Sequence, residues 1–164
     1  YKRQGNSRGA SSVAFDLGVL YKCEINDWEG AGWSVGLHVS NLGPKINYLT
    51  SKDALPATVK VGGAADLPFL QMHKLTLTAD LGYRLSPADV QALSVSAGAE
   101  YAWRELVMLR GGYHCGDKKK GDASYATAGA GVEYAGVRLD FAWLFAGHEY
   151  LARNTFWVSL GYSF

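Results

Sequence analysis

Charged side chains and histidines that recur at alternate positions are the residues of this 164-residue chain that could do chemistry. Because successive side chains of a β-strand point to opposite faces, residues at alternate positions share one face. The shared face carries charges of both signs: His38, Lys60, Asp80, Arg84, Glu100, Arg110, Glu133, Arg138 and Asp140, with Asp16, Lys22, Asp66 and His114. The simplest interpretation is the hydrated, salt-bridged lumen of a barrel. A solute pathway or a plug-binding surface is the alternative, and the sequence leaves both open.

Enzyme and metal motifs give little support for catalysis. His114, Cys115 and Asp117 group possible metal ligands at a strand end, but zinc sites usually show paired ligand spacing and a fourth ligand. No GxSxG, HExxH or P-loop pattern occurs. Serines and histidines on alternating strands could form a lipase-like site, yet no residue is marked as a nucleophile. We therefore expect no enzyme, no cofactor and no metal.

Composition narrows the class of protein. Sixteen Lys plus Arg against 15 Asp plus Glu give a net charge of +1, which argues against nucleic acid as a partner. No stretch approaches the roughly 18 to 20 apolar residues of a helical membrane span. Residues 1–9 lack the apolar stretch of a signal peptide, so we expect a chain that is mature, trimmed or a fragment. Its length predicts a single domain over residues 1–164.

The dominant pattern is strict alternation of apolar residues with small or charged ones, which predicts half-buried β-strands. About nine such segments, each of about ten residues, have the length of transmembrane β-strands. They cover residues 13–22, 33–40, 58–66, 75–85, 93–103, 107–114, 125–134, 137–145 and 156–164. All four prolines, Pro44, Pro56, Pro68 and Pro87, fall between them, where a missing backbone donor costs no ladder bond.

Aromatic residues on the apolar face gather near the strand ends, as in the double aromatic girdle of an outer-membrane barrel. If successive strands are antiparallel, one rim holds Tyr21, Trp33, Tyr101, Trp103 and Tyr134, and the other holds Tyr83, Tyr113 and Trp143. This favours an antiparallel, up-and-down transmembrane β-barrel in the bacterial outer membrane. A soluble barrel or sandwich, with the apolar face inside, is the alternative.

Connection lengths give a second argument for the same fold, because such barrels have short periplasmic turns and longer outer loops. The short turns are Arg104–Glu105, Ala135–Gly136 and the link from Pro68 to His73, with 26–31 longer; the outer loops are 42–56, 86–92, 116–124 and 146–154. Lys118, Lys119 and Lys120 then lie on an outer loop, as a solvated tip or as a contact with lipopolysaccharide. Cys23 and Cys115 fall on opposite rims, too far apart for a disulfide.

Five short segments together resemble the PorV/PorQ family. They are 14–21 (AFDLGVLY), 39–43 (VSNLG), 97–101 (AGAEY), 109–113 (LRGGY) and 158–164 (VSLGYSF). The resemblance implies a barrel similar to FadL, of about fourteen strands, that acts in type IX secretion. It implies two partners, the secretion translocon and cargo that carries a conserved C-terminal domain. Leu160, Tyr162 and Phe164 match the C-terminal signal read by the barrel-assembly machinery.

The chain is about half the family's length, so we expect it to be the C-terminal part of a longer barrel. The resemblance implies a non-enzymatic cargo shuttle or attachment component in contact with outer-membrane lipid and lipopolysaccharide. A FadL-like channel for hydrophobic small molecules is the alternative function.

Overall fold

The computed structural model describes residues 13–43, 46–47, 52–53, 55–87, 91–147 and 154–163. Most of these residues are in β-strands. Apolar residues alternate with small or charged ones along each strand, and this pattern suits a sheet with one apolar and one polar face. The strands are β1 (Phe15–Glu24), β2 (Gly32–Leu42), β3 (Ile46–Asn47), β4 (Lys52–Asp53), β5 (Thr58–Phe69), β6 (His73–Arg84), β7 (Leu93–Trp103), β8 (Val107–Cys115), β9 (Tyr125–Tyr134), β10 (Val137–Ala146) and β11 (Thr155–Tyr162). One short 3-10 helix, η2, covers Lys118–Lys120.

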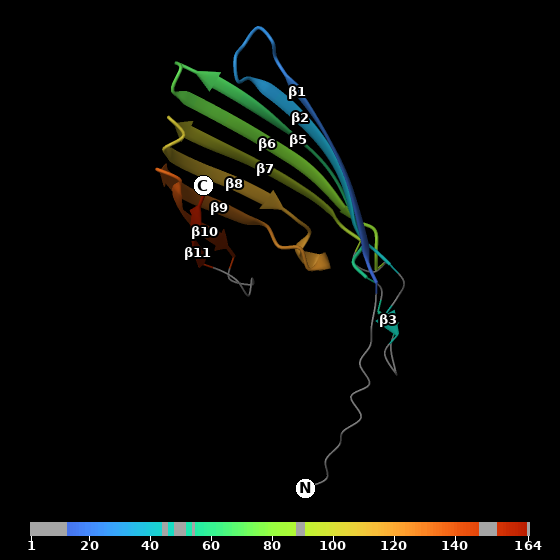
Figure 1. The fold of residues 1–164 in the computed structure, drawn as a ribbon. Helices are drawn as coiled ribbons and strands as arrows, with labels where there is room; N and C mark the ends of the chain where they lie inside the picture. The colour runs from blue at the N-terminus through green and yellow to red at the C-terminus, as the bar shows by residue number, and fades with distance from the viewer. Residues whose placement is uncertain are drawn as a thin grey trace.

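Nine of these strands form a single antiparallel sheet in the order β1-β2-β5-β6-β7-β8-β9-β10-β11 (Figure 1). Each strand pairs with the next long strand along the chain, so the topology is up-and-down. The predicted all-β antiparallel fold is thus confirmed, with each predicted segment in its own strand. The sequence pattern missed the separate β3–β4 hairpin, because strands of two residues are too short to show a period.

Connections differ between the two ends of the sheet. At one end, β5–β6, β7–β8 and β9–β10 turn through pairs of residues with positive φ: Leu70–Gln71, Arg104–Glu105 and Ala135–Gly136. Positive φ at both central residues marks the type I′ turn, whose twist matches that of a hairpin. The opposite end carries the longer connections, among them the one that holds η2. We refer to these as the turn end and the loop end.

One predicted strand boundary is wrong. Pro68 lies inside β5, opposite Lys74 of β6, instead of in the following connection. The pairing of β5 with β2 reaches only to Asp66, which lies opposite Gly32. Beyond that residue β5 has a neighbour on one side alone, so the missing N–H of proline costs no bond to β2. Pro56 and Pro87 do lie between strands, whereas Pro44 is outside the described residues.

Few side chains of the sheet are buried. Across the described residues, the buried apolar side chains are Ala31, Ala92, Ala102, Met108 and Leu144. Large apolar side chains are exposed on every long strand instead, which is unlike the core between the two layers of a sandwich. Among the described helices, none is long and apolar enough to cross a membrane. Cys23 and Cys115 are both free thiols and lie at opposite ends of the sheet.

Candidate functional site on the inner face

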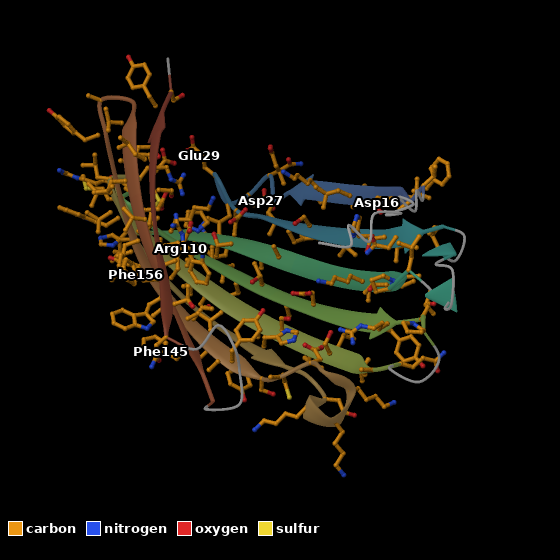
Figure 2. The ribbon with its side chains drawn as sticks, turned by 90° about the horizontal axis from the view of Figure 1, so that it is seen from below. Asp16, Asp27, Glu29, Arg110, Phe145 and Phe156 are labelled. Atoms are coloured by element: carbon orange, nitrogen blue, oxygen red, sulfur yellow. The ribbon has the colours of Figure 1, made fainter. Side chains whose placement is uncertain are left out.

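The two faces of the sheet differ in chemistry and in exposure. Ala102 and Met108 are each 7% exposed and Leu144 8%, and all three lie on the face with the charged residues. On the opposite, apolar face Tyr134 is 74% exposed and Leu160 76%. Figure 2 shows the sheet bent from β1 to β11, with Arg110 within the bend. We call the charged, more crowded face the inner face and the apolar one the outer face.

A network of five charged residues crosses the inner face from β7 to β10. Arg110 of β8 donates from Nε to Glu100 and from Nη1 to Oδ1 of Asp140, at 2.5 Å. Nε of Arg138 lies 2.7 Å from the second oxygen of Asp140, and its Nη1 lies 3.7 Å from Oε2 of Glu133. Two arginines therefore bridge three carboxylates across four adjacent strands, which leaves the network with one negative charge in excess.

Gly131 of β9 is the residue that lets this network cross a strand. β8 and β10 both pair with β9, and Gly131 lies opposite Met108 on one side and Asp140 on the other. A Cβ at Gly131 would come within 2.5 Å of Oδ1 of Asp140 and 3.4 Å of Nη1 of Arg110. The absence of a side chain there leaves the path open through which the two charges meet.

A shallow hollow of about 490 Å³ occupies the other half of the inner face, over β1, β2, β5 and β6. Gly18, Gly36 and Gly62 form its floor, and the predicted lumen residues His38, Lys60 and Asp80 border it. A Cβ at Gly62 would lie 2.9 Å from that of Asp80, so a larger residue would fill part of this space. The hollow combines small, apolar walls with one acidic and one basic side chain.

The connection from β8 to β9 folds back onto the sheet through specific bonds. Arg84 donates from Nη1 to the carbonyl oxygen of Lys120, at 3.2 Å, and Nζ of Lys120 donates to the carbonyl oxygen of Gln91. The backbone N–H of Gly116 donates to Oγ of Ser124. These bonds leave the side chains of Lys118 and Lys119 exposed at the loop end.

His114 and Asp117, which the sequence grouped as possible metal ligands, have different hydrogen-bonding roles in the structure. His114 lies between Oγ of Ser96 and Oδ1 of Asp122, each 3.0 Å from one ring nitrogen. Asp117 accepts the backbone N–H of Lys119 and so caps η2. No group of three or more His, Cys, Asp or Glu side chains within the described ranges is placed to hold a metal ion. Sequence reasoning missed Ser96 and Asp122, because contacts between different strands cannot be read from the spacing of residues along the chain.

Predicted aromatic residues lie in two rows at opposite ends of the outer face. Trp33 pairs with Cys23 at the turn end, and its ring centroid is 5.6 Å from that of Tyr21. Trp143 lies toward the loop end, stacked on Phe145 at 5.7 Å and 6.4 Å from Phe156. The remaining positions follow the strand register: Tyr101, Trp103 and Tyr134 toward the turn end, and Tyr83 and Tyr113 toward the loop end.

The chain's last strand presents its apolar row on the same face. Leu160 pairs with Leu139 and Tyr162 with Val137, and both are well exposed on the outer side of β11. The third residue of the predicted assembly signal, Phe164, lies outside the described residues.

Comparison with known proteins identifies the family. Residues 2–91, more than half of the chain, match the family described as type IX secretion system protein PorV. The matched part contains β1 to β6, and with them the whole hollow. A comparison with curated proteins gives no match. The chain therefore belongs to the PorV family, and this membership makes it an outer-membrane protein related to type IX secretion.

Proposed function

We propose that this chain is part of the wall of an outer-membrane β-barrel that receives secreted cargo at its loop end and passes it to the attachment machinery. Family membership is the observation that carries the proposal, since the family is named for the type IX secretion system. Transfer of a folded or folding cargo requires a binding surface outside the lipid but no chemical step. The role is therefore that of a carrier.

The outer face supports the placement of the sheet in a lipid bilayer. Its strands alternate between an exposed apolar row and a polar inner row, the pattern of barrels whose apolar band is about 25 Å tall. Within the nine-stranded sheet β1 and β11 have one neighbour each, and an unpaired strand edge is unfavourable in lipid. We propose that further strands pair with these two edges and close a larger barrel.

The loop end supports the placement of the cargo-binding surface. Its connections are longer than the turns at the other end, and the one from β8 to β9 is held by bonds from Arg84 and Lys120. A loop that is already ordered loses less conformational entropy when a partner binds. Lys118 and Lys119 give it a positive charge, which would attract an acidic surface on cargo, on another secretion subunit or on lipopolysaccharide.

The test uses the full-length protein in the outer membrane, with a photo-crosslinking residue in the 116–124 loop. Wild type is expected to form crosslinks to a cargo C-terminal domain or to a translocon subunit. The double variant Lys118→Glu, Lys119→Glu should reduce those crosslinks severalfold and leave cargo in the periplasm. Arg104→Glu, a charge reversal at the turn end, is the matched control. Unchanged crosslinking and secretion in the double variant, or an equal loss in the control, would contradict the proposal.

A FadL-like channel for hydrophobic small molecules is a second candidate, which the hollow favours. Its floor of Gly18, Gly36 and Gly62 could take a narrow apolar ligand. The ion network between β7 and β10 disfavours this role, because an apolar ligand gains nothing from a charged wall. Binding of a fluorescent fatty acid to the purified full-length protein, lost on Gly36→Leu, would favour the channel; no saturable binding would exclude it.

A further inference from the structure

We propose that Ser96, His114 and Asp122 form a hydrolytic triad for carboxylic esters at the loop end of the inner face. This activity goes beyond the carrier role proposed above and departs from the expectation, drawn from the sequence, that the chain is not an enzyme. The three residues come from β7, from β8 and from the connection after η2, and all three lie outside the segment matched to the family. Oγ of Ser96 lies 3.0 Å from Nδ1 of His114, and Oδ1 of Asp122 lies 3.0 Å from its Nε2.

The chemistry of the three groups fixes where the proton lies on the neutral imidazole. An ionised carboxylate can only accept, so Nε2 of His114 must carry the hydrogen and donate it to Asp122. Nδ1 is then left with a lone pair, which accepts the hydroxyl proton of Ser96. This is the division of roles in a Ser-His-Asp triad, with the two ring nitrogens exchanged.

The loop holds Asp122 in place against the histidine. Its backbone N–H donates to the carbonyl oxygen of Asp117 at 3.1 Å, and a Cβ at Gly116 would lie only 2.5 Å from its carboxyl carbon. His114 is stacked on Tyr125 at 4.8 Å, with 23° between the rings. The side chains of His114 and Asp122 are 16% and 21% exposed, so the pair is partly shielded from water. Such shielding strengthens the orientation of the imidazole by the carboxylate.

The hollow lies on the strands beside the site: its lining ends at Asp80, and none of the three triad residues belongs to it. Ser96 lies opposite Asp80, which borders the hollow, and neighbouring strands are about 5 Å apart. The small walls of the hollow suit the acyl chain of an ester. The side chain of Lys60 lies close to Gly82: a Cβ added at Gly82 would be 3.7 Å from Cε of Lys60. Gly82 in turn pairs with Ser94 of β7. Lys60 and Asp80 therefore border the hollow with opposite charges.

The reaction follows from these positions. Oγ of Ser96 bonds to the ester carbonyl carbon while its proton passes to Nδ1 of His114, and that nitrogen returns the proton to the departing alcohol. Water then attacks the acyl-serine, again losing its proton to Nδ1. The carboxylic acid leaves and Ser96 regains its hydrogen. One ester bond and one water are consumed, and no oxidant or cofactor takes part.

The experiment treats the full-length protein, in detergent and in liposomes, with a fluorophosphonate probe and with p-nitrophenyl butyrate. The probe is expected to label Ser96, identified by peptide mapping, and the butyrate ester to be hydrolysed. Ser96→Ala should abolish labelling, and Asp122→Asn should slow hydrolysis by about 100-fold or more because the imidazole loses its oriented tautomer. Ser94→Ala is the matched control, since Ser94 lies on the same strand and face but bonds the carbonyl oxygen of Gly82.

Heat-modifiable migration in gels establishes that each variant is a folded barrel. Absence of labelling in folded wild type, or equal labelling of wild type and Ser96→Ala, would overturn the triad. The carrier role is tested separately, because cargo secretion by Ser96→Ala should be normal. A secretion defect in the lysine variant together with unlabelled Ser96 would leave the carrier standing and remove the esterase.

Discussion

Arg110 and Asp140 form an ion pair across a strand to which neither belongs. Arg110 is on β8, Asp140 is on β10, and the 2.5 Å contact between Nη1 and Oδ1 passes over Gly131 of β9. Neighbouring strands are about 4.8 Å apart, so charges two strands apart must reach over the strand between them, and here Gly131 has no side chain to obstruct the contact. A contact of this kind ties three strands together at one point.

Replacing Gly131 by alanine should disrupt the ion pair between Arg110 and Asp140. The new Cβ would lie 2.5 Å from Oδ1 of Asp140, so the carboxylate or the strand must shift. We expect a loss of about 1–3 kcal/mol, the usual cost of an added methyl group in a packed site. Urea unfolding of the barrel in liposomes measures it. Gly111→Ala is the control, since the nearest atom to a Cβ there is 4.0 Å away; equal losses in both variants would contradict the argument.

The strength of the ion pair can be measured by a double-mutant cycle. Arg110→Ala and Asp140→Ala each remove one charge, and the double variant removes both. Because both side chains are between one fifth and one third exposed, we expect a coupling energy of about 0.5–1 kcal/mol that falls as salt is added. A coupling energy of zero at low salt would mean that the contact adds nothing to stability.

Charge placed on the two faces should have opposite consequences if the outer face lies in lipid. Leu77→Arg puts a cation on the outer face in the middle of β6, and Thr78→Arg puts one on the inner face at the next residue. The first should cost about 2–4 kcal/mol and reduce assembly, and the second little. Folding into liposomes, followed by gel migration, separates the two. Equal tolerance of both arginines would argue against a lipid-facing wall.

The connection after β8 should loosen when its bond to the sheet is removed. Arg84→Ala takes away the donor to the carbonyl oxygen of Lys120, so the loop is expected to open more often. Lysyl endopeptidase should then cleave after Lys118 and Lys119 about tenfold faster than in wild type, a change that corresponds to roughly 1.4 kcal/mol of lost protection. Arg138→Ala removes an arginine from the same face near the turn end and should leave the rate unchanged. Equal cleavage rates in all three proteins would show that Arg84 does not hold the loop.

Alternation in the sequence was sufficient to locate the nine long strands and to assign their residues to faces. Arg110 and Glu100, for example, share the inner face. Each is an even number of residues away from the other inner-face residues of its own strand. Short connections with turn residues, such as Ala135–Gly136, also required neighbouring strands to pair in antiparallel fashion. These are local properties, and a local pattern determines them.

Tertiary structure alone decided which side chains meet. The sequence placed Pro68 outside a strand because it could not show that β2 stops pairing at Asp66. It gave no reason to join Ser96 to His114 and Asp122, or Arg110 to Asp140 across Gly131. Such contacts depend on the register of three strands and on the space left by a glycine, and both are set only when the strands lie side by side.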